Sequence, residues 1–384
     1  MALGDWLVIE TLGAPECWSV LAVGTSPRHW KSLARTVPGQ VMPVVAAARA
    51  TGKPIERMLP KSRHAWSQQS AHAIPVVGPG DYVHAVHLRV GTGPAGLHRH
   101  SPAASGPEAA AERHHAGPAA GPHRHSPAAS GPEAAAERHH AGPAAGPHRH
   151  SPATPAAVAP YRFNSDNRRL EVASEMLGPD FDRGRSTWTG AETFEFVERF
   201  DGALDWVATI AQGEPGSRWL GEMTVRSNGG LRTLLTAARN TEGDPRLWRG
   251  LLIDITDSVP PQGKSFEAAT VDTLVGASPG LHLAVVDTEK VRVLRWISGP
   301  IPGLRWSGDT DERTLPHPDD LDRILAARTD ILAGKPVHAL PGLRLAATDR
   351  DWLVVDAEVT PLPYGPPDGQ PPRFALVRFE LRTG

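Results

Sequence analysis

The chain has 384 residues, a length that predicts two or three domains, each large enough to bury its own core. Its 40 Lys and Arg nearly balance its 42 Asp and Glu, which excludes a chain-wide attraction to nucleic acid or to anionic membranes. Cys17 is the only cysteine, so intramolecular disulfides and cysteine-based zinc sites are excluded. No stretch approaches the ~20 apolar residues of a membrane span and no signal-peptide pattern is present, so we expect a cytoplasmic protein.

Residues 1–92 predict a small α/β domain. Segments 6–12 and 18–24 have the apolar character of strands, and segment 41–52 has the periodicity of a helix. The residues expected on the apolar face of that helix are Val41, Val44, Val45 and Ala48.

The last strand expected in this region is 81–91, and successive side chains of a strand point to opposite faces. Strict alternation places His84 and His87 on opposite faces of the strand. This placement argues against a shared metal site and favours two histidines in solvent or at the edge of a core.

A tandem repeat follows residue 93. A unit of 25 residues, HRHSPAASGPEAAAERHHAGPAAGP, starts at His98, recurs from His123 and begins again at His148. The segment contains no Leu, Ile, Val or aromatic residue from His98 to Pro155, so it cannot supply a hydrophobic core. We therefore expect a disordered linker rich in His, Ala, Pro and Gly over residues 93–160.

The histidines of this linker are candidate metal ligands, because a flexible chain can wrap imidazoles around zinc, nickel or copper. The candidates are His98, His100, His114, His115, His123 and His125. The competing interpretation is repeat expansion in a stretch that no core constrains, since structural zinc sites use ligand pairs with defined spacing.

Residues 161–258 contain a clear hairpin pattern. Asn228-Gly229 separates two alternating runs, which predicts a two-residue loop with a type I′ turn. WRGLLIDIT, starting at Trp248, supplies a third strand. On the first strand of the hairpin, alternation places Trp219, Met223 and Val225 on one face.

Residues 268–384 repeat this pattern with a helix inserted. The segment 281–297 predicts a hairpin that turns at 287–290, and 316–335 predicts a helix, which three further strands follow. The residues expected on the apolar side of the helix are Leu321, Ile324, Leu325, Ile331 and Leu332. Those expected to complement the helix dipole at its start are Asp319, Asp320 and Asp322.

Three sets of motifs resemble sensory modules. WLGEMTVRSNGGLRTLLTAAR followed by WRGLLIDITD resembles the end of a PAS module, and ASPGLHLAVVD with LPHPDDLDRIL resembles a second one. AIPVVGPGDYVHAVHL is similar to part of a GAF-like domain, and the layout resembles uncharacterised actinobacterial proteins of PAS/GAF type. The resemblance implies an α+β fold, with two PAS-like antiparallel-sheet domains at 161–258 and 268–384 behind a GAF-like domain.

The residues narrow the cofactors that this resemblance would allow. No cysteine follows Cys17, so the flavin-cysteine adduct of some PAS modules is excluded. Haem-binding members use an axial histidine, and the second module offers only His282, His317 and His338. His317 precedes a proline at a helix start, where a structural role is the more common one.

One motif imitates a catalytic site. The sequence GASPG, residues 276–280, matches the nucleophile elbow G-x-S-x-G and would make Ser278 a nucleophile. The residue after the nucleophile must donate a backbone N–H to the oxyanion, and Pro279 has none. The sequence contains no catalytic constellation that we can recognise.

The expected function is that of a regulatory protein with no output domain of its own. We expect a small ligand between the sheet and the helices of the first PAS-like module. The residues expected to line that pocket are Trp188, Phe194, Val197, Trp206, Trp219, Met223 and Val225. The alternatives are an interaction scaffold with filled cores and a His-rich metal-binding protein. The expected partners are the ligand, a signalling protein or a second copy in a homodimer.

Overall fold

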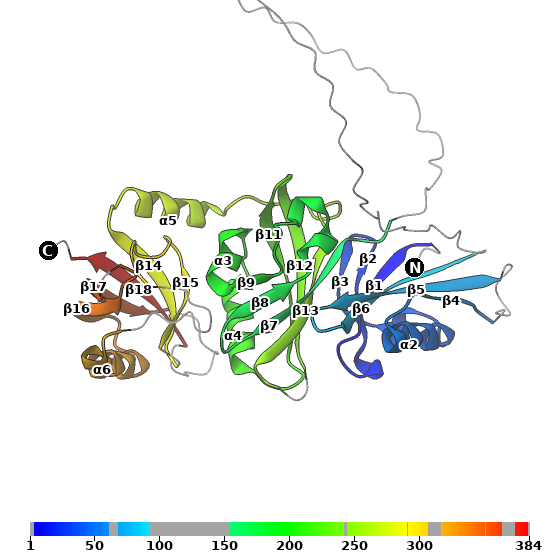
Figure 1. The fold of residues 1–384 in the computed structure, drawn as a ribbon, viewed down its shortest axis with the longest axis horizontal. Helices are drawn as coiled ribbons and strands as arrows, with labels where there is room; N and C mark the ends of the chain where they lie inside the picture. The colour runs from blue at the N-terminus through cyan, green and yellow to red at the C-terminus, as the bar shows by residue number, and fades with distance from the viewer. Residues whose placement is uncertain are drawn as a thin grey trace, which may run out of the picture. The chain divides into compact units, whose positions relative to one another are not determined.

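Three antiparallel sheets and a few helices make up the part of the chain that the computed structural model describes (Figure 1). The described residues are 4–60, 68–92, 154–241, 244–289, 291–305, 316–349, 351–362 and 373–382. They lie in one unit, which comprises residues 1–94 and 152–384. Because antiparallel sheets predominate and helices are few, the described part of the chain is a sheet-rich α+β fold. No helix in the described ranges has the length and hydropathy that a membrane crossing requires.

The N-terminal sheet has six strands in the order β3-β2-β1-β6-β5-β4, and all its pairs are antiparallel. Its strands are β1 Trp6–Glu10, β2 Ser19–Val23, β3 Ser26–Ser32, β4 Ile55–Met58, β5 Gln69–Gly78 and β6 Tyr82–Thr92. The expected α/β domain is thus an antiparallel one. Two helices accompany this sheet, α1 Leu33–Thr36 and α2 Met42–Thr51. The predicted face of α2 is confirmed: Val41, just before the helix, and Val44, Val45 and Ala48 within it are all buried.

A β-bulge in β6 overturns the prediction for the two histidines. Val76 pairs with Ala85, but Val77 pairs with Val83, so His84 is an extra residue in the ladder. Alternation restarts at the bulge, and His84 and His87 both point to the face of the sheet that Ala85 occupies. The prediction that His84 and His87 lie on opposite faces of the strand was therefore wrong.

The middle sheet has seven strands in the order β10-β11-β12-β13-β7-β8-β9. They are β7 Val158–Asn164, β8 Arg169–Val172, β9 Thr187–Thr189, β10 Val197–Arg199, β11 Arg218–Ser227, β12 Gly230–Asn240 and β13 Leu247–Asp254. Helices α3 Gly190–Glu195 and α4 Ala203–Gln212 lie between β9 and β11 along the chain. Strand β7 begins inside the expected linker, because Val158 and Ala159 are buried and pair with β13.

The hairpin β11–β12 lies where the sequence predicted it, with Ser227 paired to Gly230. Its turn differs from the expected type I′, since Gly230 has a positive φ of 117° and neither Asn228 nor Gly229 does. A side chain from elsewhere explains the glycine at 229: a Cβ there would lie 2.4 Å from Oδ2 of Asp180. The Asp180 carbonyl also accepts a hydrogen bond from the Asn228 N–H at 3.0 Å.

The C-terminal sheet has five strands in the order β15-β14-β18-β17-β16. They are β14 Leu281–Asp287, β15 Arg292–Trp296, β16 His338–Ala346, β17 Trp352–Pro361 and β18 Phe374–Leu381, which confirms the predicted hairpin and three final strands. Helix α5 Phe266–Gly276 precedes this sheet, and α6 Leu321–Leu332 packs on it. The predicted apolar side of α6 was partly wrong: Ile331 is buried as predicted, but Leu321 and Leu325 are exposed, and Ala327, which was not predicted, is buried.

All three sheets share one connection order. In the C-terminal sheet, a hairpin (β14–β15), a helix and a three-stranded meander follow one another, and the last strand pairs with the first. The N-terminal sheet repeats this order in β2-β1-β6-β5-β4, and the middle sheet repeats it in β8-β7-β13-β12-β11. The described chain is therefore built from three copies of one topology.

One apolar cluster joins the N-terminal and middle sheets. It combines side chains of β1, β2, β5 and β6 with side chains of β7, β12 and β13, including the fully buried Ile253. At its margin Arg239 of β12 donates two hydrogen bonds to the Glu10 carboxylate, at 2.9 and 3.1 Å, and both side chains are buried. Removing one partner of such a pair costs about 3–5 kcal/mol, because the other charge remains buried.

Gly250 of β13 is closely packed against its own sheet, and its carbonyl is also bonded to the N-terminal sheet. A Cβ at Gly250 would lie 2.2 Å from the Ala237 carbonyl oxygen and 2.3 Å from the Tyr161 ring. The Tyr161 hydroxyl donates to that same carbonyl at 3.1 Å, and burial raises the pKa of Tyr161. Nδ1 of His84 lies 3.0 Å from the Gly250 carbonyl oxygen, so a histidine of one sheet is bonded to the backbone of the other.

We predict that Gly250→Ala lowers the free energy of unfolding by about 1–3 kcal/mol or more, because the added methyl group has no space. Gly263→Ala is the matched control, since nothing lies within 4 Å of a Cβ at that position. Urea unfolding of both variants measures the difference. Equal stability of the two variants would contradict the packing described for Gly250.

We predict that acid lowers the stability of the protein because His84 and His87 are buried in their neutral form. Burial lowers the pKa of His84 and of His87 to about 4, whereas an unfolded histidine titrates near 6.5. Below pH 6.5 the unfolded chain binds protons that the folded chain does not, so stability falls between pH 6.5 and pH 4. Each histidine contributes up to about 3 kcal/mol to this loss.

Urea unfolding at pH 7 and at pH 5 measures this dependence. The loss of stability between the two pH values should be smaller in His87→Gln than in the wild-type protein. His72→Gln serves as the control: the rings of His87 and His72 both contact the Trp6 ring, at 6.4 and 5.6 Å between centroids, but His72 is only half-buried. An unchanged pH dependence in His87→Gln would show that His87 is not the group that titrates.

Candidate ligand cavity

A cavity of about 110 Å³ lies between α6 and the C-terminal sheet. Fifteen of its nineteen lining residues are apolar, and all five strands of this sheet together with α6 contribute to the lining. Apolar walls of this kind accept an apolar guest; an engineered site of 150 Å³ holds benzene. The size of this one fits roughly four to six heavy atoms of a ligand.

Four polar residues line the same cavity: Asp287, Thr288, Arg292 and Arg328. Asp287 ends β14 and Arg292 begins β15, and the two are opposite each other in the hairpin register. Both are buried, and their opposite charges offset each other. Arg328 comes from the facing helix, and its Nε donates to the Thr288 carbonyl at 2.7 Å. The cavity thus has apolar walls and a small polar region.

These four residues were not among the predicted site residues, although the sequence of α6 indicates one of them. Ile324, Arg328 and Ile331 have the spacing i, i+4 and i+7, so they share the stripe that faces the sheet. A cation on the apolar stripe of an amphipathic helix is unusual, because burying a charge is costly. The position of Arg328 on this stripe is therefore the feature of the sequence that indicates a polar group between α6 and the sheet.

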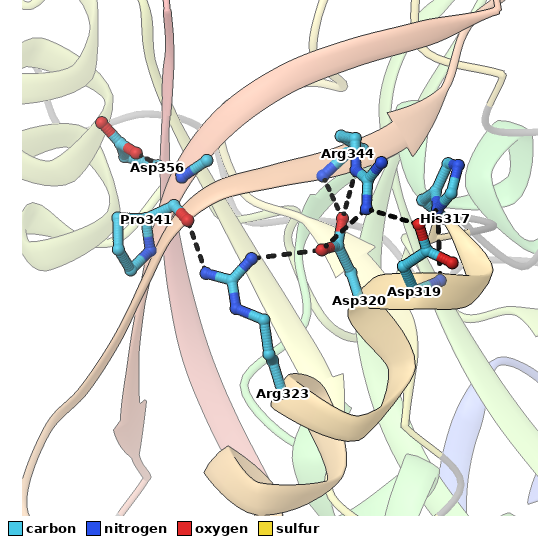
Figure 2. A network of polar contacts seen from close by, with 8 residues as sticks. His317, Asp319, Asp320, Arg323, Pro341, Arg344 and Asp356 are labelled. Carbon is cyan, nitrogen blue, oxygen red and sulfur yellow. Dashed lines mark hydrogen bonds and ion pairs between the residues drawn. The ribbon is translucent and has the colours of Figure 1, made fainter.

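An ion-pair network holds the start of α6 on the sheet (Figure 2). The Asp320 carboxylate accepts hydrogen bonds from the Arg344 Nε of β16 at 3.0 Å and from the Arg323 Nη1 of α6 at 3.1 Å. The Arg344 guanidinium lowers the pKa of Asp320 to about 2. Asp320 therefore does more than complement a helix dipole: it ties the helix above the cavity to a strand of the cavity wall.

The structure gathers the seven predicted pocket residues in one place, in the core of the middle sheet. Trp188, Val197, Trp219 and Val225 belong to a single apolar cluster, against which Phe194, Trp206 and Met223 pack. The aromatic rings contact one another, as in Phe194 with Trp206 at 6.3 Å between centroids. The predicted residues are thus neighbours, while the 110 Å³ cavity lies at the C-terminal sheet.

The histidines considered for haem occupy three separate places. His317 caps the turn before α6, where its Nδ1 accepts from the Asp319 N–H at 3.2 Å, and its ring contacts Trp352. His338 lies 2.9 Å from Asp330, and His282 lies in β14. The six linker histidines, from His98 to His125, lie outside the described residues. Within the described ranges no group of three His, Cys, Asp or Glu could hold a metal ion.

Ser278 has the wrong structural context for a nucleophile elbow. It follows helix α5 and precedes strand β14, whereas an elbow turns from a strand into a helix. The Ser278 N–H donates to the Val275 carbonyl at 3.0 Å, as expected of a residue that ends a helix. The G-x-S-x-G match therefore reflects a turn.

Two family models match this chain. Residues 5–96 match the model described as Rv3651-like, N-terminal, and residues 270–363 match the model described as Rv3651-like, C-terminal domain. Neither model covers the middle sheet, and no curated protein matches the chain.

A solved structure extends the similarity over the whole chain. The crystal structure of an uncharacterised protein from Mycobacterium tuberculosis has 18% identity and a TM-score of 0.62, and the match covers 99% of this chain and 97% of that chain. At this identity the likeness shows the fold alone. The expected resemblance to uncharacterised actinobacterial proteins is confirmed, whereas these matches name neither PAS nor GAF.

Two sensory proteins give weaker matches. An RNA-binding light-oxygen-voltage receptor has a TM-score of 0.22 and 10% identity, covering 58% of this chain and 94% of that chain. A methyl-accepting chemotaxis protein X has a TM-score of 0.19 and 14% identity, covering 59% and 75%. These scores carry no argument about this chain.

Proposed function

We propose that this is a regulatory protein that binds a small, mainly apolar molecule in the cavity between α6 and the C-terminal sheet. The observation that carries the proposal is the cavity itself, a concave site of about 110 Å³ formed by α6 and all five strands of the sheet. Apolar walls with a few convergent polar groups are typical of ligand sites. The ligand site that the sequence predicted in the middle module is thereby moved to the C-terminal one.

The shared topology supports a sensory role of the PAS and GAF type. Each of the three units has a hairpin, a helical connection and a meander whose last strand pairs with the first strand of the hairpin. In this proposal the protein has no catalytic task, and a change in ligand occupancy passes to a separate polypeptide in the cytoplasm. Fold alone does not define function, so the cavity is the feature to test.

An interaction scaffold is the second candidate, and helix α5 favours it. Phe266 is 82% exposed and Leu274 is 62% exposed, which is unusual for apolar side chains on one short helix. In that case α5 would contact a partner protein, and the cavity would have no ligand. The two candidates differ in whether occupying the cavity changes the behaviour of the protein.

We predict that a screen of small apolar molecules raises the melting temperature of the wild-type protein, because a ligand that binds only the folded state stabilises it. Ala357→Leu should abolish the effect, since Ala357 lines the cavity and a larger side chain would occupy it. Met223→Trp enlarges a residue of the middle cluster instead and should leave the effect intact.

The two variants decide between the sites. Loss of the thermal shift in Met223→Trp alone would return the ligand to the middle module, where the sequence placed it. The absence of any shift in the wild-type protein across the screen would favour the scaffold.

A further inference from the structure

We infer that the ligand of the C-terminal cavity carries an anionic head group, a carboxylate or a group of similar charge, which pairs with Arg328. This inference rests on the proposed function and adds the chemical class of the ligand. Its basis is the distribution of charge around the cavity, where Asp287, Arg292 and Arg328 are the charged lining residues.

The charges of the lining residues do not cancel. Asp287 and Arg292 lie opposite each other in the β14–β15 register, so one carboxylate and one guanidinium offset each other. Arg292 is held further by the Ser165 carbonyl oxygen, 3.1 Å from its Nη2. Arg328 is left as the cation of the cavity that has no carboxylate within ion-pair distance among the described residues.

The hydrogen bonds of Arg328 leave its terminal nitrogens available. Its Nε donates to the Thr288 carbonyl, which fixes the guanidinium beside the end of β14. Nη1 and Nη2 have no hydrogen-bond partner among the residues that the structure describes. A guanidinium offers parallel donors that match the two oxygens of a carboxylate, so a ligand anion would meet an oriented partner.

The apolar lining determines the rest of the ligand. Ile324, Ala327 and Ile331 of α6 face Leu340, Leu343 and Leu345 of β16 across the cavity. With a volume of about 110 Å³, the site accepts an apolar body of roughly four to six heavy atoms. A short-chain carboxylic acid has this combination of a small apolar tail and a single charge.

Pentanoate and its neutral analogue pentanamide form a matched pair of probes, because they share the tail and differ in the charge of the head group. Binding to the full-length protein is measured by titration at constant ionic strength. We expect pentanoate to bind the wild-type protein at least tenfold more tightly than pentanamide, as charge-assisted hydrogen bonds to a half-buried guanidinium require.

Variants of one arginine test the role of the charge. Arg328→Gln should weaken pentanoate binding about tenfold or more and leave pentanamide binding unchanged, and Arg328→Lys should restore part of the preference. Arg378→Gln is the control, because Arg378 is an exposed arginine of β18 that pairs with Glu380 outside the cavity. Melting curves without ligand show whether each variant is folded.

The outcomes separate this inference from the proposed function. Equal binding of both probes, or full pentanoate affinity in Arg328→Gln, would overturn the anionic ligand and keep the cavity as a ligand site. If neither probe binds the wild-type protein, the inference and the proposed function are both overturned for ligands of this size.

Discussion

The contact between the N-terminal and middle sheets is the constraint on which much of this structure depends. Each of these sheets has one face covered by its own helices, and the opposite faces bury a shared apolar cluster between them. The paired charges of Glu10 and Arg239 and the hydrogen bond between His84 and the Gly250 carbonyl link the two sheets at this contact. Separating the two sheets would leave each of these charges buried and unpaired, which costs several kcal/mol, roughly 3–5 for such pairs.

Local pattern was enough to predict most of the strands, the helix α2 and the position of the Asn228-Gly229 hairpin. These features depend on neighbours in the sequence, namely alternation, helical periodicity and turn residues. The wrong predictions concern segments whose conformation depends on contacts with residues far away in the sequence. The bulge at His84 accompanies a hydrogen bond to Gly250 of another sheet, and the turn at Gly229 is shaped by Asp180. On α6 the prediction was right for Ile324 and Ile331 and wrong for Leu321 and Leu325, because the sheet contacts only part of the predicted stripe.

The candidate site shows the same limit. The aromatic residues expected to enclose a ligand do come together, since apolar residues on facing elements collect in one core. Whether such a core is filled by its own side chains or contains a cavity depends on the volumes of side chains from several strands. The sequence of one segment does not predict this. The sequence shows that Arg328 is a cation on the apolar stripe of α6. Its role in a cavity could be inferred only from the structure, which places Asp287 and Arg292 in the same lining.

The central claim is that the C-terminal unit holds a small organic ligand, and native mass spectrometry tests it most directly. The protein would be purified from its own host without a His tag, so that added metal does not enter through purification. The account predicts a folded chain with one small organic adduct, absent from Ala357→Leu. Adducts that consist of metal ions alone, or the bare chain mass in both proteins, would contradict it.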